Sequence, residues 1–470
     1  MTRPARETSR AFLAALLTAT AAARLALAWT FPGFLSGDDL EIVETAARWA
    51  VRLDYSPWPI RSLFHPLLLA FPAVKAGAAV GLASPHWLTF LAAIPTAAFS
   101  TLGVWLAYRV ALALGGDEAT GRAAAFLAAT AWVPFAYGAT QYPRPISSAL
   151  LLGAFLLLVR PGERARDAAL AGLLAAAAFA VRWSEGVALI PLAGLVLLRD
   201  RGLRRALALA AGFAAGVVLF VGAFDAATWG APFASLRAFL AFMRAPHDAF
   251  TPRPPLWYVG MVLQWTGPVL LLLAAFAVRD RRARAPMLAA LTFVVLLSPT
   301  PLKGLRYLMF AVLLLAVAAA FGWERLRRGG RTGRALATIC LAAAVPLCAE
   351  RTLHLMREKS QPAITAARYL ASLEPPVRAA ALEQSWAWGD RLYLGNGVRI
   401  VDLRATTPLA DGALAAAAEC DAIGLYLSDA SEDVRRELAL RGFRESARFA
   451  DSGGRHVVVF LGNRPRSGRD

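Results

Sequence analysis

Long apolar runs recur along this chain between residues 11 and 349. Each run is about 15 to 25 residues long, which is the length that an α-helix needs to cross the hydrocarbon core of a bilayer. The composition agrees, because 58% of the residues are hydrophobic, 17% are charged and the mean hydropathy is +0.50. A soluble domain carries about a quarter charged residues. The sequence therefore predicts a polytopic α-helical membrane protein.

We predict eleven spans, at residues 11–31, 86–114, 120–137, 146–160, 167–182, 184–198, 204–224, 256–278, 286–300, 305–323 and 334–349. The first run follows a basic segment, as in a signal peptide, but Ala-Trp-Thr-Phe-Pro at its end is a poor cleavage site. An uncleaved first span is therefore expected.

The formal charge of +18 could indicate a nucleic-acid-binding protein. The basic residues instead cluster in short loops between apolar runs, at Arg160–Arg166, Arg199–Arg205, Arg279–Arg284 and Arg325–Arg334. Such clusters mark cytoplasmic loops, because positive charge resists translocation. We therefore expect membrane lipids and no nucleic acid among the partners. Lysine occurs only at positions 75, 303 and 359, which indicates a GC-rich bacterial genome and hence the inner, cytoplasmic membrane.

The apolar segment 63–84 decides the topology. If it crosses the membrane, the Arg160–Arg166 loop and all later arginine clusters lie outside; if it does not, they lie inside together with the N-terminus. The positive-inside rule favours the second arrangement. The segment contains Pro66, Pro72 and Lys75, so we expect an interfacial helix. The C-terminus is then extracytoplasmic.

The tail after the last span is polar. Helical periodicity around 361–373 and 431–441 accompanies strand-like runs at Val398–Val401, Ala422–Tyr426 and His456–Leu461. The order predicts two domains: a membrane domain at residues 1–349, with an extracytoplasmic loop at 32–85, and a small extracytoplasmic α/β domain at residues 350–470.

The first predicted outer loop carries Asp38, Asp39, Glu41 and Glu44 within seven residues. Carboxylates at a membrane surface are costly unless they are solvated or bind something. If a helix starts at Asp38, Leu40, Val43 and Ala47 form its apolar side. A structural alternative stays open, because Asp38 with Glu41 fits a capping box and Glu44 with Arg48 fits an i,i+4 ion pair.

Basic and aromatic residues recur in the predicted outer loops. Arg61 and His65 close the first loop behind Trp58, and the later outer helix ends carry Arg144, Arg182, Lys303, Arg306 and Tyr307. Outer loops should be poor in cations, so these positions need an explanation. A bound anion is one, since arginine grips phosphate through its planar fork. Anchoring to lipid headgroups is the alternative at any single position.

These residues carry a family resemblance. Gly37-Asp38-Asp39-Leu40-Glu41, followed by Trp58-x-Ile60-Arg61-Ser62 and Pro66, resembles the first loop of the family 22 glycosyltransferases, the GPI-anchor and N-glycan mannosyltransferases of the GT-C superfamily. Asp225 with Trp229-Gly230 and Pro255-Leu256-Trp257-Tyr258 are similar to later motifs of that family, as is Lys303-Gly304-Leu305-Arg306-Tyr307. Asp39 and Gly304 depart from the family, which has Glu at both positions, and Leu302 stands where the family has His. The likeness extends over about residues 30–310.

The resemblance implies a reaction. A sugar, mannose by family, would pass with inversion from a polyprenyl-phosphate donor to an extracytoplasmic lipid-linked or glycan acceptor. Asp38 would act as general base, with Asp39 as its partner or as the base itself. Lys303 and Arg306 would hold the donor phosphate, with Arg144 and Arg182 as further candidates. Arg61 and His65 would shape the loop or touch the acceptor, and Glu41 and Tyr307 would line the substrate site.

No metal or cofactor is expected, because Cys340, Cys348 and Cys420 have no ligand spacing and the leaving group is a monophosphate. Two other classes stay open. A lipid or solute transporter would need ionisable residues near mid-membrane and broken helices in corresponding halves. A membrane scaffold or receptor would explain the outer domain but not the loop acids and outer cations.

Overall fold

The structure is a computed structural model that describes the chain apart from residues 1–2, 32–33, 35–36, 163, 201, 245–252, 301–302, 359–361, 386–387, 404–408, 451–455 and 464–470. The chain forms two compact units, and each is described by itself. One unit comprises Met1–Thr30, Trp58–Leu69 and Ala93–Leu353, and the other comprises Phe31–Pro57, Ala70–Ala92 and His354–Asp470.

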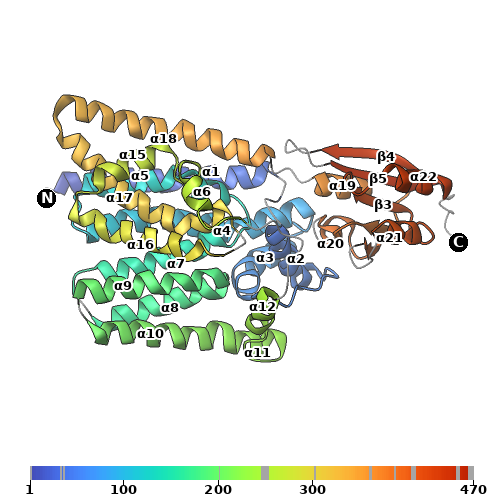
Figure 1. Ribbon diagram of the computed structural model, residues 1–470, viewed down its shortest axis with the longest axis horizontal. Helices are drawn as coiled ribbons and strands as arrows, with labels where there is room; N and C mark the ends of the chain where they lie inside the picture. Colours follow the sequence, from blue (N-terminus) through green and yellow to red (C-terminus); the bar gives the residue numbers. More distant parts are fainter. Residues whose placement is uncertain are drawn as a thin grey trace. The chain divides into compact units, whose positions relative to one another are not determined.

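The first unit is a bundle of helices (Figure 1). Its helices of ten or more residues are α1 (Arg3–Thr30), α5 (Glu118–Ala129), α7 (Arg144–Val159), α8 (Ala165–Val181), α9 (Leu189–Asp200), α10 (Leu203–Val217), α12 (Ala234–Arg244), α15 (Pro268–Ala277), α16 (Arg281–Leu297), α17 (Met309–Arg328) and α18 (Gly330–Glu358). Shorter elements are α6 (Trp132–Tyr137), η2 (Trp183–Ala188), η3 (Val218–Ala223), α11 (Phe224–Trp229), α13 (Trp257–Gly260), α14 (Val262–Thr266) and η4 (Leu305–Leu308). The helix α4 (Pro85–Ala113) contributes to both units.

Every predicted span lies on helical segments, but two predicted runs are interrupted. Residues 120–137 form α5 and α6 with a break at Thr130–Ala131, because Pro134 lacks an N–H and its ring would clash with the carbonyl group of Thr130. Residues 256–278 form α13, α14 and α15; Gly267, with φ of +74°, and Pro268 begin the last of these. The segment 63–84 is helical at η1 (Pro66–Ala70) and α3 (Phe71–Ala79).

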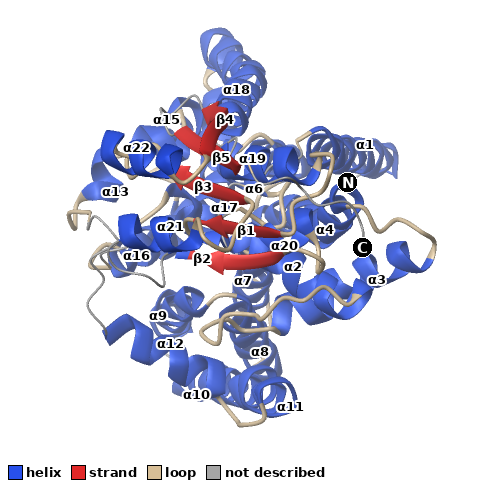
Figure 2. Cartoon of the chain, turned by 90° about the vertical axis from the view of Figure 1, so that its right-hand side faces the viewer, coloured by secondary structure: helices blue, strands red, loops and turns tan. Residues whose placement is uncertain are grey.

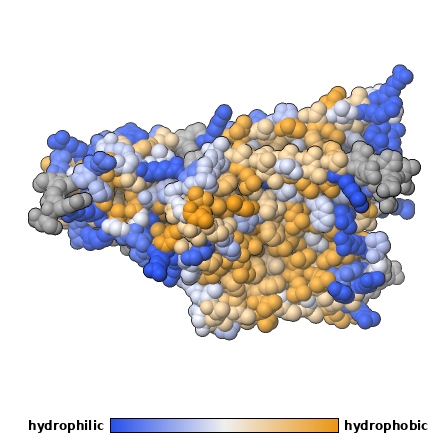
Figure 3. Space-filling view, turned by 180° about the vertical axis from the view of Figure 1, so that it is seen from behind, coloured by the Kyte–Doolittle hydropathy of each residue, from blue (hydrophilic) through white to orange (hydrophobic). Residues whose placement is uncertain are grey.

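Five helices among the described residues are long and apolar enough to cross a bilayer: Arg10–Thr30, Pro85–Ala113, Leu203–Trp229, Leu305–Arg328 and Gly330–Arg357. Shorter apolar helices accompany them at Pro66–Ala79, Arg144–Val159, Trp183–Leu198 and Pro268–Ala277. Hydrophobic side chains cover most of the face of the helical unit in Figure 3, and hydrophilic ones gather at its right-hand end. A multi-pass membrane protein is confirmed; the count of eleven spans stays a prediction.

The core of the bundle is built around α17, which packs against α5, α7, α15 and α16. Most of its residues are buried, 15 of 20. Glycines permit the closest helix contacts: a Cβ atom on Gly322 would lie 1.8 Å from the carbonyl oxygen of Leu273 on α15, and one on Gly212 of α10 would lie 2.1 Å from that of Ala169 on α8. Small residues at helix crossings are typical of membrane bundles, where packing rather than the hydrophobic effect holds helices together.

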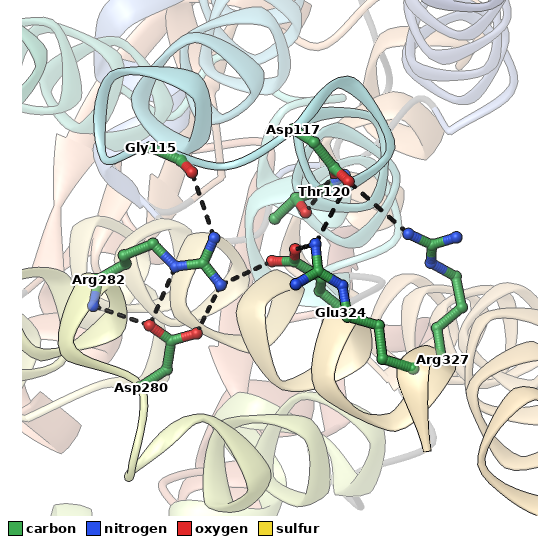
Figure 4. A network of polar contacts seen from close by, with 8 residues as sticks. Gly115, Asp117, Thr120, Asp280, Arg282, Glu324 and Arg327 are labelled. Carbon is green, nitrogen blue, oxygen red and sulfur yellow. Dashed lines mark hydrogen bonds and ion pairs between the residues drawn. The ribbon is translucent and has the colours of Figure 1, made fainter. Parts of the chain in front are cut away.

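A polar network ties α5, α16 and α17 at the end of the bundle that carries the arginine-rich loops (Figure 4). Arg282 binds the carboxylate of Asp280 at 2.8 Å and that of Glu324 at 2.9 Å, and it donates to the carbonyl group of Gly115 at 3.2 Å. Glu324 also pairs with Arg328, which lies 3.7 Å from Asp117, the N-cap of α5. The side chain of Glu324 is 1% exposed. This buried carboxylate therefore links two of the helices directly.

The second unit is an α/β fold, which confirms the predicted C-terminal class. Its elements are α2 (Gly37–Val51), α3, α19 (Pro362–Ala371), β1 (Ala379–Leu382), α20 (Asp390–Leu394), β2 (Arg399–Asp402), α21 (Leu409–Ala416), β3 (Ala422–Tyr426), α22 (Glu432–Leu440), β4 (Phe443–Ala450) and β5 (His456–Gly462). The sheet order is β2-β1-β3-β5-β4, as Figure 2 shows, with β1, β2 and β3 parallel and β4 and β5 antiparallel to their neighbours.

Both faces of the sheet are covered. Ala379 and Ala381 of β1 face a core shared with α21 and α22, whereas Ala380 and Leu382 face a core shared with α19. This two-residue alternation is the normal consequence of the β pleat. The α2 helix joins the same unit through a third core, in which its apolar side packs with Ile364 and Leu392.

Replacing Glu324 by Gln should destabilise the helical unit by about 3 kcal/mol, because Arg282 and Arg328 lose a buried counter-charge. Chemical unfolding in detergent micelles measures the change. The matched control is Glu350→Gln, since Glu350 pairs with Arg351 at 3.4 Å but is 63% exposed; its effect should stay within about 0.5 kcal/mol. Equal stabilities of the two variants would contradict the structural role of the network.

Candidate functional site

Three of the predicted outer cations lie at helix ends on one side of the bundle. Arg144 is the first residue of α7, Arg182 follows the last residue of α8, and Arg306 lies in η4, directly before α17. The opposite ends of these helices adjoin the arginine-rich segments Arg160–Arg166 and Arg325–Arg334. These cations therefore belong to the other side of the bundle from the loops that the positive-inside rule explains.

Two tyrosine rings gather the three guanidinium groups. The Cζ atoms of Arg182 and Arg306 lie 5.5 and 5.2 Å from the centroid of the Tyr142 ring. The Cζ atom of Arg144 lies 3.9 Å from the centroid of the Tyr307 ring, and that of Arg306 lies 5.5 Å from it. Cation–π attraction offsets part of the repulsion between like charges held this close. The result is a concentrated positive site, which we call the arginine–tyrosine cluster (Tyr142, Arg144, Arg182, Arg306 and Tyr307).

One buried ion pair fixes the cluster to η2. Arg144 donates from Nη1 to Oε1 of Glu185 at 2.7 Å and from Nη2 to Oγ of Ser184 at 2.8 Å. Its Nε donates to the hydroxyl group of Tyr142 at 3.4 Å. The side chains of Arg144 and Glu185 are 2% and 1% exposed. Every nitrogen of this guanidinium thus has a partner, and the geometry of Arg144 is set by the protein itself.

Lys303 reaches backbone carbonyl groups. Its ammonium group donates to the carbonyl of Arg253 at 2.9 Å and to that of Thr300, and the residue is buried. These contacts link the segment before η4 to the segment before α13. Lys303 is therefore placed as a positive charge beside two loop carbonyls, in the same unit as the arginine–tyrosine cluster.

The second part of the first loop packs against this unit. The indole N–H of Trp183 donates to the carbonyl of Ile60 at 3.1 Å, and the Phe64 ring lies 5.4 Å from that of Phe220. Arg61 lies with its Cζ 5.5 Å from the centroid of the Trp58 ring. These contacts hold Arg61 and His65 on the helical unit, as neighbours of the α8–η2 junction.

His65 is buried beside Arg182. Burial, with the charge of Arg182 as a second cause, lowers the pKa of His65 to about 3. Neither ring nitrogen has a hydrogen-bond partner among the residues that the structure describes. The imidazole is therefore neutral near pH 7, with one nitrogen able to donate and the other able to accept.

The acidic residues belong to the other unit. Asp38, Asp39 and Glu41 lie in the first two turns of α2; Asp39 is fully buried, and Asp38 and Glu41 are half-buried. Leu40 and Val43 form the apolar side, as predicted. The arginine–tyrosine cluster and these carboxylates are thus in different compact units.

The alternative of an i,i+4 ion pair between Glu44 and Arg48 is wrong. Glu44 accepts from the backbone N–H of Leu392 at 3.4 Å, and Arg48 donates to the carbonyl of Tyr55 at 3.0 Å. Burial, with the nearby Asp390 as a second cause, raises the pKa of Glu44 well above its usual value. Glu44 points into the core of its unit, so a solvent-exposed helical pair with Arg48 cannot form.

Sequence reasoning left Tyr142, Ser184 and Glu185 out of the site. Glu185 lies in η2, and its pairing with Arg144 joins residues 41 apart in sequence. Glu185 could have been found from the sequence, because an acidic residue at a helix end of an apolar bundle needs a partner. Tyr142 had a weaker signal, since its ring acquires a role only when two arginines from other helices reach it.

Lowering the pH should destabilise the protein through His65. Its pKa in the folded state lies below the value of 6.5 expected in the unfolded state, so protons bind preferentially to the unfolded chain. The contribution of neutral His65 to the free energy of unfolding is complete above about pH 6.5, and it is lost as the pH drops from there toward about 3. Between pH 7 and pH 5 the wild type should lose about 2 kcal/mol more than the His65→Asn variant. Parallel pH profiles of unfolding for the two proteins would rule this out.

Comparison with solved structures shows the fold. The structure of ArnT from Cupriavidus metallidurans in the apo state aligns with a TM-score of 0.65 at 14% identity, over 95% of this chain and 97% of that chain. The Archaeoglobus fulgidus oligosaccharyltransferase aligns with a TM-score of 0.53 at 12% identity, over 97% and 75%. The arabinofuranosyltransferase AftD from Mycobacteria aligns with a TM-score of 0.55 at 18% identity, over 96% and 42%. This chain therefore shares the fold of these three proteins.

The sequence comparison gives the family. The model of the Alg9-like mannosyltransferase family matches residues 42–379, which is well over half of the chain. No curated protein matches. A second ArnT structure from Cupriavidus metallidurans, bound to undecaprenyl phosphate, aligns with a TM-score of 0.63 at 15% identity. With the family matched over most of its length and the fold shared throughout, this chain belongs to the Alg9-like mannosyltransferase family of GT-C membrane glycosyltransferases.

Proposed function

We propose that this protein transfers a sugar, mannose by family, from a polyprenyl-phosphate donor to a lipid-linked or glycan acceptor on the extracytoplasmic side of the inner membrane. The observation that carries the proposal is the arginine–tyrosine cluster. It concentrates three guanidinium groups at helix ends of an apolar bundle, on the side opposite the arginine-rich loops. A lipid phosphate at the membrane surface is an anion of the right charge and depth for such a site.

The arginines divide the work in this proposal. All three nitrogens of the Arg144 guanidinium are bonded to Glu185, Ser184 and Tyr142. Arg144 therefore contributes the electrostatic field of its positive charge rather than a direct bond to the phosphate. Arg182 and Arg306, whose Cζ atoms lie 5.5 and 5.2 Å from the centroid of the Tyr142 ring, are the direct ligands of the phosphate. Lys303 adds a further positive charge near η4. Fixed cations of this kind stabilise the charge that develops on a leaving group, because they need no rearrangement during the reaction.

The proposed reaction is an inverting displacement. The carboxylate of Asp38, with Asp39 as its partner or as the base itself, takes the proton of an acceptor hydroxyl group. The hydroxyl oxygen forms a bond to the anomeric carbon as the bond from that carbon to the phosphate oxygen breaks. The electron pair of the broken bond leaves with the polyprenyl phosphate, whose charge the arginines neutralise. Glu41, Arg61, His65 and Tyr307 complete the substrate site, with His65 able to donate one hydrogen bond to a neutral or anionic oxygen.

Transfer by the purified, reconstituted full chain tests this function. A panel of polyprenyl-phosphate sugars that includes the mannose form is offered with lipid-linked acceptors, and both the released polyprenyl phosphate and the glycan product are measured by mass spectrometry. Asp38→Asn or Asp39→Asn should lower transfer by at least about a hundredfold while the protein still inserts and purifies normally, since each loses a carboxylate that can accept a proton.

The matched control is Asp433→Asn, because Asp433 is 88% exposed on α22 and should be dispensable. Full transfer by both the Asp38→Asn and Asp39→Asn variants would contradict the catalytic assignment. Movement of the donor lipid across a proteoliposome membrane without any glycan product would favour a transporter instead.

A further inference from the structure

The C-terminal residues hold the helix that carries the proposed general base. The α2 helix is grouped with residues 354–470 in one compact unit rather than with the helical bundle that precedes and follows it in sequence. Three sets of contacts, at the start, the middle and the end of α2, join it to the segment 388–396. All of them lie within this unit.

At the start of α2, Leu40 packs against Gly389. The fit is close: a Cβ atom on Gly389 would lie 2.9 Å from Cδ1 of Leu40, and the φ of +61° at Gly389 suits glycine. Leu40 directly follows Asp39 and is fully buried in the core that also contains Ile364 and Leu392. The backbone next to the two aspartates is therefore fixed by C-terminal residues.

In the middle of α2, Glu44 accepts the backbone N–H of Leu392 at 3.4 Å. Glu44 lies one or two helical turns after Asp38 and Asp39, and it is buried. A buried acid with a specific backbone donor gives the helix a defined rotation about its axis, because any other rotation would leave the carboxyl group without that partner. The contact thus constrains which way the aspartates point.

At the end of α2, Asn396 clamps a strained turn. Arg52, the first residue after the helix, has φ of 59°, a left-handed conformation that is costly for a residue other than glycine. The side-chain amide of Asn396 donates to the carbonyl of Arg52 at 2.9 Å, and its oxygen accepts from the backbone N–H of Asp54 at 2.7 Å. Such strain persists only where neighbouring groups enforce it. One asparagine therefore satisfies two backbone groups on either side of residue 53.

We propose that the segment 388–396 is a positioning element for α2 and that Asn396 is its decisive side chain, so that the C-terminal domain acts in the reaction by fixing Asp38 and Asp39. The effect on the reaction rests on the proposed function, whereas the anchoring of α2 does not. Asn396 is a positioning residue and touches no substrate. Its effect on turnover arises because small displacements of a general base cost rate steeply.

The experiment compares three variants of the full chain in lipid nanodiscs. Asn396→Ala removes the clamp. Asn463→Ala, another exposed asparagine at the far end of β5, is the matched control. In the third variant Arg52→Gly is added to Asn396→Ala, because glycine adopts the left-handed conformation without strain and commonly ends helices. Hydrogen exchange of the α2 amides and transfer kinetics are measured on each.

Asn396→Ala should raise exchange of the α2 amides about tenfold, since the two hydrogen bonds from Asn396 to the backbone of Arg52 and Asp54 are lost. It should lower kcat about tenfold, with the KM for the donor within about twofold. Asn463→Ala should change neither, and Arg52→Gly should restore both in the Asn396→Ala background.

Two outcomes overturn the inference. Unchanged exchange in α2 of Asn396→Ala would show that the clamp does not hold the helix. Raised exchange with wild-type kcat, in an enzyme that Asp38→Asn or Asp39→Asn inactivates, would show that the anchoring has no catalytic effect. Full activity of both aspartate variants is a different result, because it removes the proposed function whatever the exchange data show.

Discussion

The ion pair between Arg144 and Glu185 is the interaction on which the proposed anion site depends. A charge buried in an apolar bundle is stable only when its partners satisfy it, and Arg144 has a carboxylate, a hydroxyl group and a phenol around its three nitrogens. The pair joins the first turn of α7 to η2 and places the Arg144 guanidinium over the ring of Tyr307. Tyr142 and Tyr307 in turn hold Arg182 and Arg306. Loss of the pair would release the whole cluster.

The first loop is divided between the two units, and this division gives it two tasks. Its acidic half, on α2, is anchored by C-terminal residues through Leu40, Glu44 and the turn at Arg52. Its basic half, with Arg61 and His65, is anchored on the helical bundle through Trp183 and Phe220. The acidic residues of the loop and its basic residues are thus fixed by separate sets of interactions.

Composition and periodicity predicted the helical membrane bundle, because a bilayer demands long apolar helices whatever their partners are. They also located β2, β3 and β5. They missed β1, since Ala-Ala-Ala-Leu at 379–382 has helical propensity and becomes a strand only between β2 and β3. They missed β4, whose side chains are mostly exposed at the sheet edge. The helix breaks near Pro134 and at Gly267, which precedes Pro268, could have been predicted from proline geometry.

The sequence predicted several residues of the candidate site, but not which of them contact one another. Cations at helix ends opposite the arginine-rich loops were visible as exceptions to a topological rule, and the structure brings Arg144, Arg182, Arg306 and Tyr307 together. The pairing of Arg144 with Glu185, the burial of His65 beside Arg182 and the two hydrogen bonds of Asn396 all depend on tertiary contacts between residues far apart in sequence. Local rules favoured a Glu44–Arg48 pair, and burial against Leu392 overrode it.

An experimental structure of the full chain in a nanodisc, with a non-hydrolysable polyprenyl-phosphate mannose bound, would test the proposed anion site directly. We expect the phosphate to lie within hydrogen-bonding distance of the guanidinium groups of Arg182 and Arg306, with the anomeric carbon turned toward the carboxylates of Asp38 and Asp39. A phosphate bound elsewhere, with the arginine–tyrosine cluster closed on itself, would contradict it.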